Sequence, residues 1–250
     1  MKRQSRLSTL AAPAVLLLVW QLGSTSGLVP ATILVPPAQV LATAADLWAE
    51  NEIQRHLAAS LSRLGAGYAL GAAAGLAFGT LIALSRLARD LLAPSFLAVR
   101  QVPVLSFLPL LVLMLGIEEQ FKVFIVATAA FFPVALAAFD GIRDVPKAWF
   151  EVARVYRTPL PQFVLRILAP AALPAVLVGL RIGLTRAWLV LIAAELLAAD
   201  SGVGQMMEMG RQLFQLDVVL TGIVLSGVIG FSLDFLMRRA EVRLTRWRAA

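Results

Sequence analysis

The sequence has 250 residues, of which 60% are hydrophobic and only 15% charged, and its mean hydropathy is +0.83. Soluble domains are about half apolar and about a quarter charged, so this composition indicates an integral membrane protein. The formal net charge of +7 does not indicate nucleic-acid binding, because the arginines stand at the ends of apolar runs and not on one basic face. That placement is typical of charges that set membrane orientation.

Several chemistries are excluded by what the sequence lacks. Without cysteine there is no disulfide framework, thiolate metal site or cysteine nucleophile. His56, the single histidine, stands among charged neighbours and is predicted to be a solvated surface residue without a catalytic role. No stretch reads G-x-x-x-x-G-K-[ST], so the chain has no phosphate-binding loop of this type. We therefore predict a non-enzymatic chain with no metal and no cofactor of its own.

Apolar runs of about 17 to 25 residues predict helices that cross the membrane, because lipid offers backbone groups no other partner than the helix itself. The third candidate is short and contains Pro103 and Pro109, so its ends are poorly defined. The sequence predicts an all-α, polytopic membrane protein of about six transmembrane helices. The candidates are Leu7–Leu22, Leu64–Leu84, Val102–Leu115, Phe121–Phe139, Pro174–Ala199 and Val218–Met237.

The first apolar segment has two interpretations. KRQSR followed by LAAPAVLLLVW resembles a signal peptide, but the STSG that follows offers no A-x-A cleavage site, which favours a retained anchor. We predict an N-terminal anchor helix and periplasmic segment over 1–60. A transmembrane core then covers 61–250, with a cytoplasmic loop at about 140–170.

Positive charge alternates along the connections between the candidate spans. It gathers in the N-terminus MKRQSR, in SRLARDLLAPSFLAVR, in the loop at 140–170 and in the tail RRAEVRLTRWR, while the other connections are acidic or balanced. Cytoplasmic loops carry the excess of lysine and arginine. We therefore predict that both termini and the segment Glu151–Pro174 are cytoplasmic.

Gly67, Gly71, Gly75 and Gly79 recur every four residues in the second candidate span. This spacing places them on one helix face, where a neighbouring backbone can approach closely. The pattern favours packing within the chain, and contact with a second membrane subunit is the alternative.

The stretch EVARVYRTPLPQFVLRILAPAALP, Glu151–Pro174, is polar and interrupted by prolines between long apolar runs. Asp144 is predicted to cap a short amphipathic helix that ends at Arg157, and Thr158 to cap a second one, QFVLRIL. Pro170 and Pro174 are expected to break the chain before the fifth span. The predicted apolar face consists of Val145, Ala148, Trp149, Val152 and Tyr156.

Two roles fit this helix pair. An amphipathic hairpin can lie on the lipid surface, or its apolar stripe can fill a groove on a cytoplasmic partner. The pattern alone does not choose between them.

A resemblance favours the second role. The segment resembles the "EAA" loop of ATP-binding-cassette (ABC) importer permeases, in which a Glu-Ala-Ala start is followed by a glycine and then by Ile-x-Leu-Pro. The matching residues are Glu151, Ala153, Ile167 and Pro170, with Val152 in place of the first alanine and Ala169 in place of the leucine. Arg157 stands where the family has glycine. Because a non-glycine residue disfavours a left-handed turn, the bend or its partner is predicted to be altered.

The resemblance extends from about Leu34 to the C-terminus. LVPPAQVLAT, VRQVPVLSFLPLLVLMLGI, FFPVALAAFDGIRDV, LPAVLVGLRIGL and AAELLAADSGVG are similar to the nitrate/sulfonate/taurine-type permeases. It implies a type I ABC importer permease-like fold in a bacterial inner membrane, with 61–250 as the permease core.

The resemblance also implies partners. These are a second permease subunit, identical or related, two cytoplasmic ATPase subunits that would bind ATP and Mg²⁺, and a substrate-binding protein. The helix starting near Glu151 would enter a groove on the ATPase, so that ATPase closure moves the spans. The residues implied in this coupling are Trp149, Glu151, Val152, Ala153, Arg154, Tyr156 and Arg157.

Arg181, Arg186 and Glu195 are ionisable residues within the fifth candidate span, where such groups usually face a cavity or a partner. For Arg181 a structural role near the cytoplasmic side is favoured, in which its guanidinium bonds to backbone carbonyls or extends toward the membrane surface. Arg186 lies about 7.5 Å deeper and is hypothesised to line the translocation pathway. For Glu195 a fold role and a gate role remain open.

The implied cargo is a small anion such as an alkanesulfonate, taurine or nitrate, with a pyrimidine-type vitamin precursor as the runner-up. A stand-alone secondary transporter or channel is a different class of answer, but it needs ion-coupling residues that are nearly absent from the spans. A membrane anchor for a cytoplasmic enzyme is a third.

Overall fold

A computed structural model describes residues 6–26 and 34–246, and within these ranges every regular element is a helix. The predicted all-α fold is confirmed. The basic residues Lys2 and Arg3, and the end of the tail from Trp247, lie outside the described residues. The elements are α1 Arg6–Thr25, α2 Pro37–Ala49, α3 Glu52–Leu84, α4 Arg86–Val99, η1 Val104–Phe107, α5 Leu108–Leu115, α6 Glu119–Arg143, α7 Lys147–Val155, α8 Leu160–Phe163, η2 Val164–Leu168, α9 Ala169–Leu197, α10 Val203–Gln212 and α11 Leu216–Leu244.

The described residues contain four helices that are long and apolar enough to cross a membrane: α3, α6, the helix Pro161–Leu197 and α11. A fifth span exists if α4 and the segment Val104–Leu115 count as one unit bent by 84°. The sequence predicted six. The first candidate falls in α1, whose apolar part Val15–Thr25 is shorter than a span.

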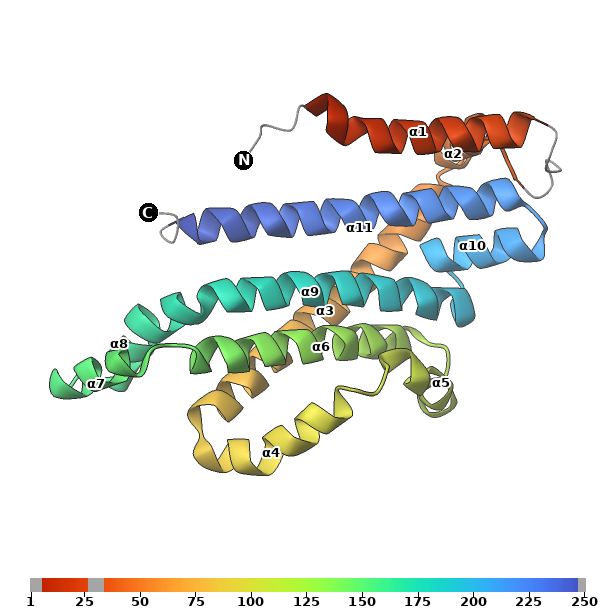
Figure 1. The fold of residues 1–250 in the computed structure, drawn as a ribbon. Helices are drawn as coiled ribbons and strands as arrows, with labels where there is room; N and C mark the ends of the chain where they lie inside the picture. Colours follow the sequence, from red (N-terminus) through yellow and green to blue (C-terminus); the bar gives the residue numbers. More distant parts are fainter. Residues whose placement is uncertain (1–5, 27–33, 247–250) are drawn as a thin grey trace.

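The third candidate span, Val102–Leu115, is not one helix but a 3₁₀ turn followed by the short helix α5. Pro103 precedes the 3₁₀ turn and Pro109 stands in the first turn of α5, where a missing N–H costs nothing. Gly116, with φ of 71°, then ends the helix. The prolines therefore divide this apolar run, and α4, α5 and the turn between them form a bent corner beside α6 (Figure 1).

The core is the contact of α3 with α6 and of α6 with α9. Gly67, Gly71, Gly75 and Gly79 are all buried and face α6. A Cβ on Gly75 would lie 2.7 Å from the carbonyl oxygen of Phe131, and a Cβ on Gly67 would lie 2.8 Å from that of Val123. The glycine face thus lets the two backbones approach within this chain.

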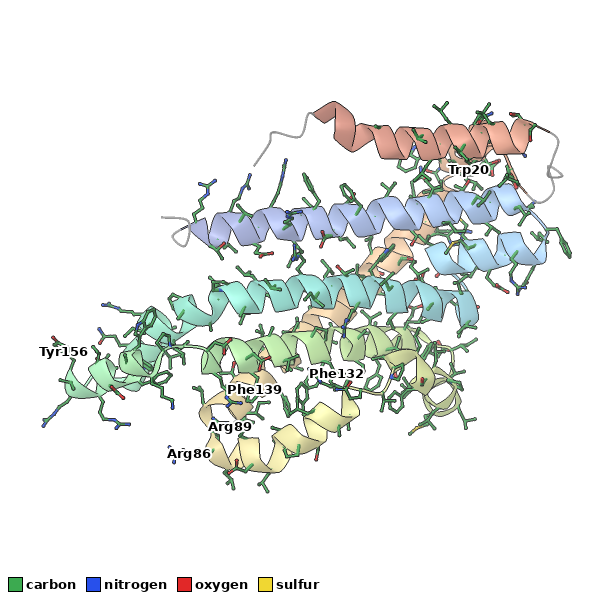
Figure 2. All side chains as sticks on the ribbon, viewed as in Figure 1. Trp20, Arg86, Arg89, Phe132, Phe139 and Tyr156 are labelled. Atoms are coloured by element: carbon green, nitrogen blue, oxygen red, sulfur yellow. The ribbon has the colours of Figure 1, made fainter. Side chains whose placement is uncertain are left out.

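Polar side chains fasten the remaining helices to this core. The Tyr68 hydroxyl on α3 donates to the carbonyl of Leu180 on α9 at 3.0 Å, and the Trp188 indole on α9 donates to the carbonyl of Ser226 on α11 at 3.1 Å. In a membrane such bonds satisfy carbonyls that lipid cannot. The Trp20 indole of α1 donates to the carbonyl of Val35, just before α2, at 3.1 Å (Figure 2).

The corner between α3 and α4 is held by Ser85 and Arg89. The Ser85 hydroxyl accepts a hydrogen bond from the backbone N–H of Ala88, which caps α4. Arg89, labelled at this corner in Figure 2, donates to the carbonyls of Ile82 and Ala83 at the end of α3. A cation beside the last carbonyls of a helix complements its dipole.

Candidate coupling surface and transmembrane cleft

α7 projects from one end of the helix bundle (Figure 1). It begins after Pro146, not at a cap formed by Asp144 as predicted, because Pro146 occupies the capping position with an extended backbone. Its inner side is anchored: Ala153 is buried, and the ring of Phe150 packs on Phe163 of α8 with centroids 5.0 Å apart. This contact joins a cluster that includes Ile82 of α3 and Phe139 of α6.

The predicted apolar face of α7 is not the face that packs against the rest of the chain. Of its members only Val145, just before the helix, is buried, while Trp149, Val152 and Tyr156 are 45%, 53% and 79% exposed. The reason is a second apolar stripe formed by Phe150 and Ala153, which takes up the internal contact. The first stripe is therefore left facing outward, and Tyr156 stands at the extremity of the molecule (Figure 2).

The coupling residues implied by the resemblance fall mainly on this outward side. Glu151, Arg154 and Arg157 are exposed beside the apolar residues, and Ala153 alone of the set faces inward. We call this surface the outer face of α7; it consists of Trp149, Glu151, Val152, Arg154, Val155 and Tyr156.

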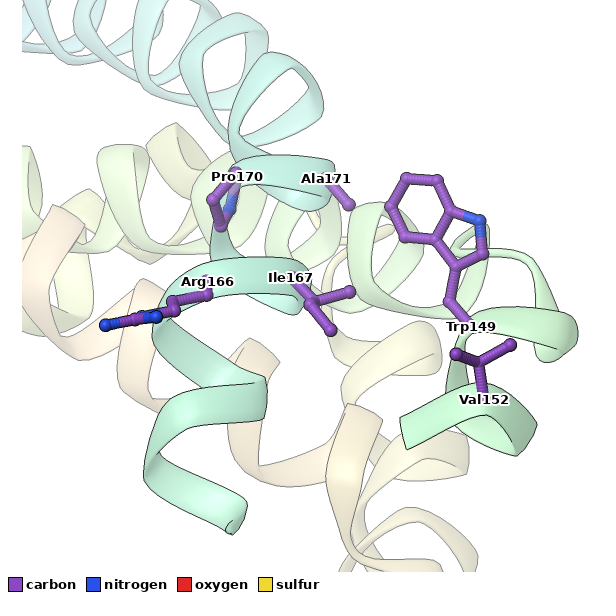
Figure 3. Close-up of a pocket in the computed structure, with 6 residues that line it drawn as sticks. All are labelled: Trp149, Val152, Arg166, Ile167, Pro170 and Ala171. Atoms are coloured by element: carbon purple, nitrogen blue, oxygen red, sulfur yellow. The ribbon is translucent and has the colours of Figure 1, made fainter. Parts of the chain in front are cut away.

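A cleft of about 400 Å³ lies at the base of the outer face, between α7 and the beginning of α9 (Figure 3). The Trp149 ring points toward Ala171, and Ile167 and Pro170 form the opposite wall. The lining is almost wholly apolar, with Arg166 at the rim directed away from the tryptophan.

Arg157 adopts the left-handed backbone conformation, with φ of 48°. The Thr158 N–H donates to the Ala153 carbonyl at 2.9 Å, across the bend, as in the turn that commonly closes a helix around glycine. The predicted change of geometry at this position is therefore wrong for the backbone. The turn is the one that glycine would make, and arginine holds it at a conformational cost of about 1–2 kcal/mol.

Pro170 and Pro174 do not break the chain, contrary to the prediction. Residues Pro161–Leu197 form one helical rod of 37 residues. The turn before Pro170, Val164–Leu168, is a π-helix, in which the N–H of Ala169 bonds to the carbonyl of Val164, five residues back. This wider turn accommodates a residue that has no N–H to donate. The segment that follows α7 is therefore continuous with a membrane span.

A second cleft opens farther along the same rod, between α4, α6 and α9. It has a volume of about 500 Å³, and its polar lining residues are Arg100, Gln101, Asp140 and Arg186. A neighbouring hollow of about 260 Å³ shares Arg100, Gln101, Arg186 and the ring of Phe132. The pathway candidate Arg186 thus lies on a cleft together with Arg100, which the sequence analysis did not single out.

Arg181 lies outside that cleft. Its Nε is 3.6 Å from Oε2 of Glu241 and 3.9 Å from Oδ1 of Asp234, both on α11. The separation of five residues from Arg186 turns the two arginines to different sides of α9. In this structure Arg181 joins two helices.

Glu195 lies at the end of α9 far from α7 and is 1% exposed. Its carboxylate accepts hydrogen bonds from the Ser60 hydroxyl at 2.8 Å, from Nη1 of Arg63 at 2.9 Å and from the N–H of Gly204 at 3.1 Å. Gly202, with φ of 119°, is required beside it, because any Cβ there would collide with the carboxylate.

Arg63 extends this buried cluster to α6. Its Nε and Nη2 donate to the Glu119 carboxylate at 2.6 and 2.7 Å, and Nη2 also donates to the Ser201 hydroxyl at 2.7 Å. We call the group of His56, Ser60, Arg63, Glu119 and Glu195 the clamp, since it ties α3, α6 and α9 and the turn before α10 together.

The prediction that His56 is solvated is wrong. The side chain is buried, its Nδ1 accepts the N–H of Gly202 at 3.0 Å, and its Nε2 lies 3.3 Å from Oε2 of Glu52. Sequence reasoning missed the clamp apart from Glu195. Arg63 and Ser60 lie four and seven residues before Gly67, and therefore on the same face of α3 as the glycines. The carboxylate of Glu195 within another span was the signal that could have pointed to these two polar residues as its partners.

Long apolar helices packed through a glycine face, with an amphipathic helix projecting from one end, define a polytopic α-helical membrane protein. The chain belongs to the family of binding-protein-dependent transport system inner membrane components, whose sequence pattern matches residues 71–246. It is therefore a transport permease of an ABC importer, and the predicted resemblance is confirmed.

Relatives that are named as transport permeases match nearly the whole chain. It is 39% identical over 247 residues to a putative aliphatic sulfonates transport permease protein, SsuC, of Bacillus subtilis, covering 99% of this chain and 90% of that one. It is 36% identical to the taurine transport system permease protein TauC of Escherichia coli, covering 99% and 91%. It is 31% identical to the nitrate import permease protein NrtB of Synechocystis, covering 89% and 83%.

The fold also has a counterpart among solved structures. A chain of the inward-facing MetNI methionine ABC transporter superposes with a TM-score of 0.64 at 20% identity, covering 75% of this chain and 93% of that one. At this identity the likeness shows the fold alone. The predicted permease-like architecture is thus confirmed.

Proposed function

We propose that this chain forms the translocation pathway of an importer for a small anion, namely an alkanesulfonate, taurine or nitrate, and that a separate cytoplasmic ATPase drives it through α7. The named relatives transport cargo of this kind, which supports the class of substrate. The observation that carries the coupling role is the outer face of α7, which exposes Trp149, Val152 and Tyr156 although the helix is firmly anchored on its inner side.

An exposed apolar stripe flanked by Glu151 and Arg154 is suited to a groove on another protein, with the charges fixing orientation. The same helix is joined to a continuous 37-residue rod, so a displacement of α7 is passed directly into the membrane. ATP and Mg²⁺ would then bind and react on the ATPase subunits, and this chain would need no cofactor of its own.

The proposal includes an orientation in the membrane. α1 begins and α11 ends toward the side from which α7 projects (Figure 1). Arg143, Lys147, Arg154, Arg157 and Arg166 cluster on that side, which the positive-inside rule assigns to the cytoplasm. Both termini are then cytoplasmic, and the clamp lies toward the outer surface, where a substrate-binding protein would deliver cargo.

A single chain offers only one wall of a pathway, so the proposal also includes a second permease subunit, identical or related. Arg186 is the pathway residue that lines the cleft between α4, α6 and α9. Arg181 and Glu195 would contribute by holding the helices that frame it, through Glu241 on α11 and through the clamp.

The experiment that tests the coupling role is co-purification of the ATPase with the permease after Glu151→Ala combined with Tyr156→Ala. We expect loss of the ATPase from the detergent-purified complex and loss of ethanesulfonate uptake. Phe231→Ala, which removes a ring that is 71% exposed on α11, is the matched control and should retain both. If the double variant retains the ATPase and takes up ethanesulfonate at the full rate, the proposal is contradicted.

A further inference from the structure

The cleft between α4, α6 and α9 carries more positive than negative charge. Two arginines line it, Arg100 at the end of α4 and Arg186 on α9, whereas Asp140 is its only acidic residue among those described. Arg100 interacts electrostatically with Asp140, whose carboxylate also interacts with Asp144 and Arg143. Counted over the residues that line the cleft, the formal charge is one positive unit.

Arg186 is the group left without compensation. Within residues 6–26 and 34–246 its guanidinium has no hydrogen-bond or ion-pair partner, in contrast to Arg181 on the same helix and Arg63 on α3. An arginine inside a membrane protein normally pairs with a carboxylate or with backbone carbonyls. An unpaired guanidinium that lines a cleft is therefore able to bind an anion.

The cleft is lined by apolar side chains as well as by its charged ones. Phe132, labelled in Figure 2 where α6 passes α4, lines both hollows, and Leu136, Val178 and Ile182 complete the larger one. Nitrate has no apolar part to place against such walls. A short alkyl chain attached to an oxyanion has one, and its burial would add affinity.

The cleft also has a direction along the membrane. Arg186 shares the smaller hollow with Ala129 and Phe132, near the middle of α6. Asp140 lies eight residues further along α6, about 12 Å toward the α7 end. An anion held at Arg186 is thus at mid-depth, in a cleft that extends as far as Asp140 toward the proposed cytoplasmic side.

We infer that Arg100 and Arg186 form a binding site inside the membrane for one monovalent organic oxyanion of the alkanesulfonate type. The guanidinium of Arg186 donates to the sulfonate oxygens, Arg100 supplies the second positive group, and the alkyl part lies against Phe132 and Ile182. Planar guanidinium groups match oxyanions through paired hydrogen bonds. This inference rests on the proposed function and narrows its cargo from anions in general to organic ones.

The test is equilibrium binding of radiolabelled ethanesulfonate to the importer complex in lipid nanodiscs without its binding protein. We expect saturable binding that Arg186→Gln and Arg100→Gln each weaken on the order of ten- to a hundredfold, the worth of a charge-assisted hydrogen bond. Arg186→Lys should retain part of the affinity. Nitrate should compete more weakly than methanesulfonate, and the neutral diethyl sulfone should not compete.

Arg238→Gln is the matched control, because it removes the same charge from an exposed position on α11. Equal binding by wild type and by both cleft variants would overturn the inference, as would the absence of ethanesulfonate binding to the wild type. Dissociation of the permease pair in Arg186→Gln, with binding retained per intact pair, would assign the arginine to a carboxylate of the second subunit and overturn it as well.

Uptake into proteoliposomes by the complete importer separates this inference from the proposed function. If the wild type imports ethanesulfonate and both cleft variants import it equally, only the binding site is wrong. If the wild type imports no anion at all, the proposed function fails with it.

Discussion

The two ends of the rod Pro161–Leu197 differ in how far the surrounding side chains find their contacts within the same chain. At the far end, Glu195 is 1% exposed and is bonded by Ser60, Arg63 and Gly204. Next to the near end, the outer face of α7 exposes Trp149, Val152 and Tyr156 to solvent. The first end is complete within one polypeptide, and the second has the composition of a surface that another protein covers.

This difference gives different expectations for substitutions at the two ends. Changes in the clamp should act on the folding of the permease itself. Changes on the outer face of α7 should leave folding unchanged and act on assembly. Substitutions in the two regions can separate effects on folding from effects on assembly, and the largest effect is expected in the clamp.

Arg63→Met should destabilise the protein by about 3–5 kcal/mol, because it leaves the buried Glu195 carboxylate without its cation. The free energy of unfolding in mixed micelles measures the loss. Combining it with Glu195→Gln should recover part of it, since the amide keeps an acceptor for Ser60 without the charge.

The control for this pair is Glu208→Gln on α10. Arg211 and Gln212 lower the pKa of Glu208 to about 2, so the carboxylate is charged at neutral pH, but it is partly exposed and lies outside the clamp. Its loss should barely change stability. If Arg63→Met lowers the free energy of unfolding as little as this control does, the clamp does not hold the far end of the rod in place.

Gly75→Ala should destabilise by about 1–3 kcal/mol, because the added Cβ would stand 2.7 Å from the Phe131 carbonyl oxygen and would force α3 away from α6. Gly65→Ala in the same helix meets nothing within 4 Å and should stabilise slightly through reduced backbone entropy. Thermal unfolding of the two variants gives the comparison. Equal shifts of the same sign would mean that the glycine face is not closely packed.

Arg157→Gly should stabilise the protein by about 1 kcal/mol, because it relieves the left-handed conformation at φ of 48°. Arg154→Gly removes the same side chain from a helical position three residues earlier and should instead destabilise by about 1 kcal/mol. Unfolding free energies of both variants decide the matter. Destabilisation by Arg157→Gly would show that the arginine side chain makes a contact worth more than the strain.

Val155→Ser, on the outer face of α7, should change the unfolding free energy by less than about 0.5 kcal/mol, because the side chain is 79% exposed. ATPase retention in the same preparation should fall. A large loss of stability with unchanged ATPase retention would reverse the distinction between the two ends.

The long helices were predictable because composition and run length decide membrane spans, and α3, α6 and α11 contain the corresponding candidates. The buried side of α7 was not predictable from its pattern. The helix carries two apolar stripes, and only tertiary packing selects Phe150 and Ala153 over Trp149 and Val152. Likewise, Pro170 reads as a helix breaker until the π turn ahead of it is known.

The candidate sites show the same limit. Arg186 and Glu195 stood out because charges in apolar runs are rare. Their surroundings did not, because Arg63 is 132 residues from Glu195 and Arg100 is 86 residues from Arg186 (186 − 100). His56 was placed on the surface from its charged sequence neighbours, whereas its side chain is buried and bonded to the N–H of Gly202, which a single sequence does not bring near it.

The unbroken rod Pro161–Leu197 is about 55 Å long, nearly twice the thickness of the hydrocarbon layer it crosses. Fastened at Glu195, it is a lever with its pivot at one extremity. A tilt of about 10° around that pivot would carry the π turn beside α7 through about 8 Å, while Arg186, at roughly a third of that arm, would travel only about 2 Å. In the proposed coupling, a large displacement of α7 by the ATPase would therefore become a small displacement at the cleft.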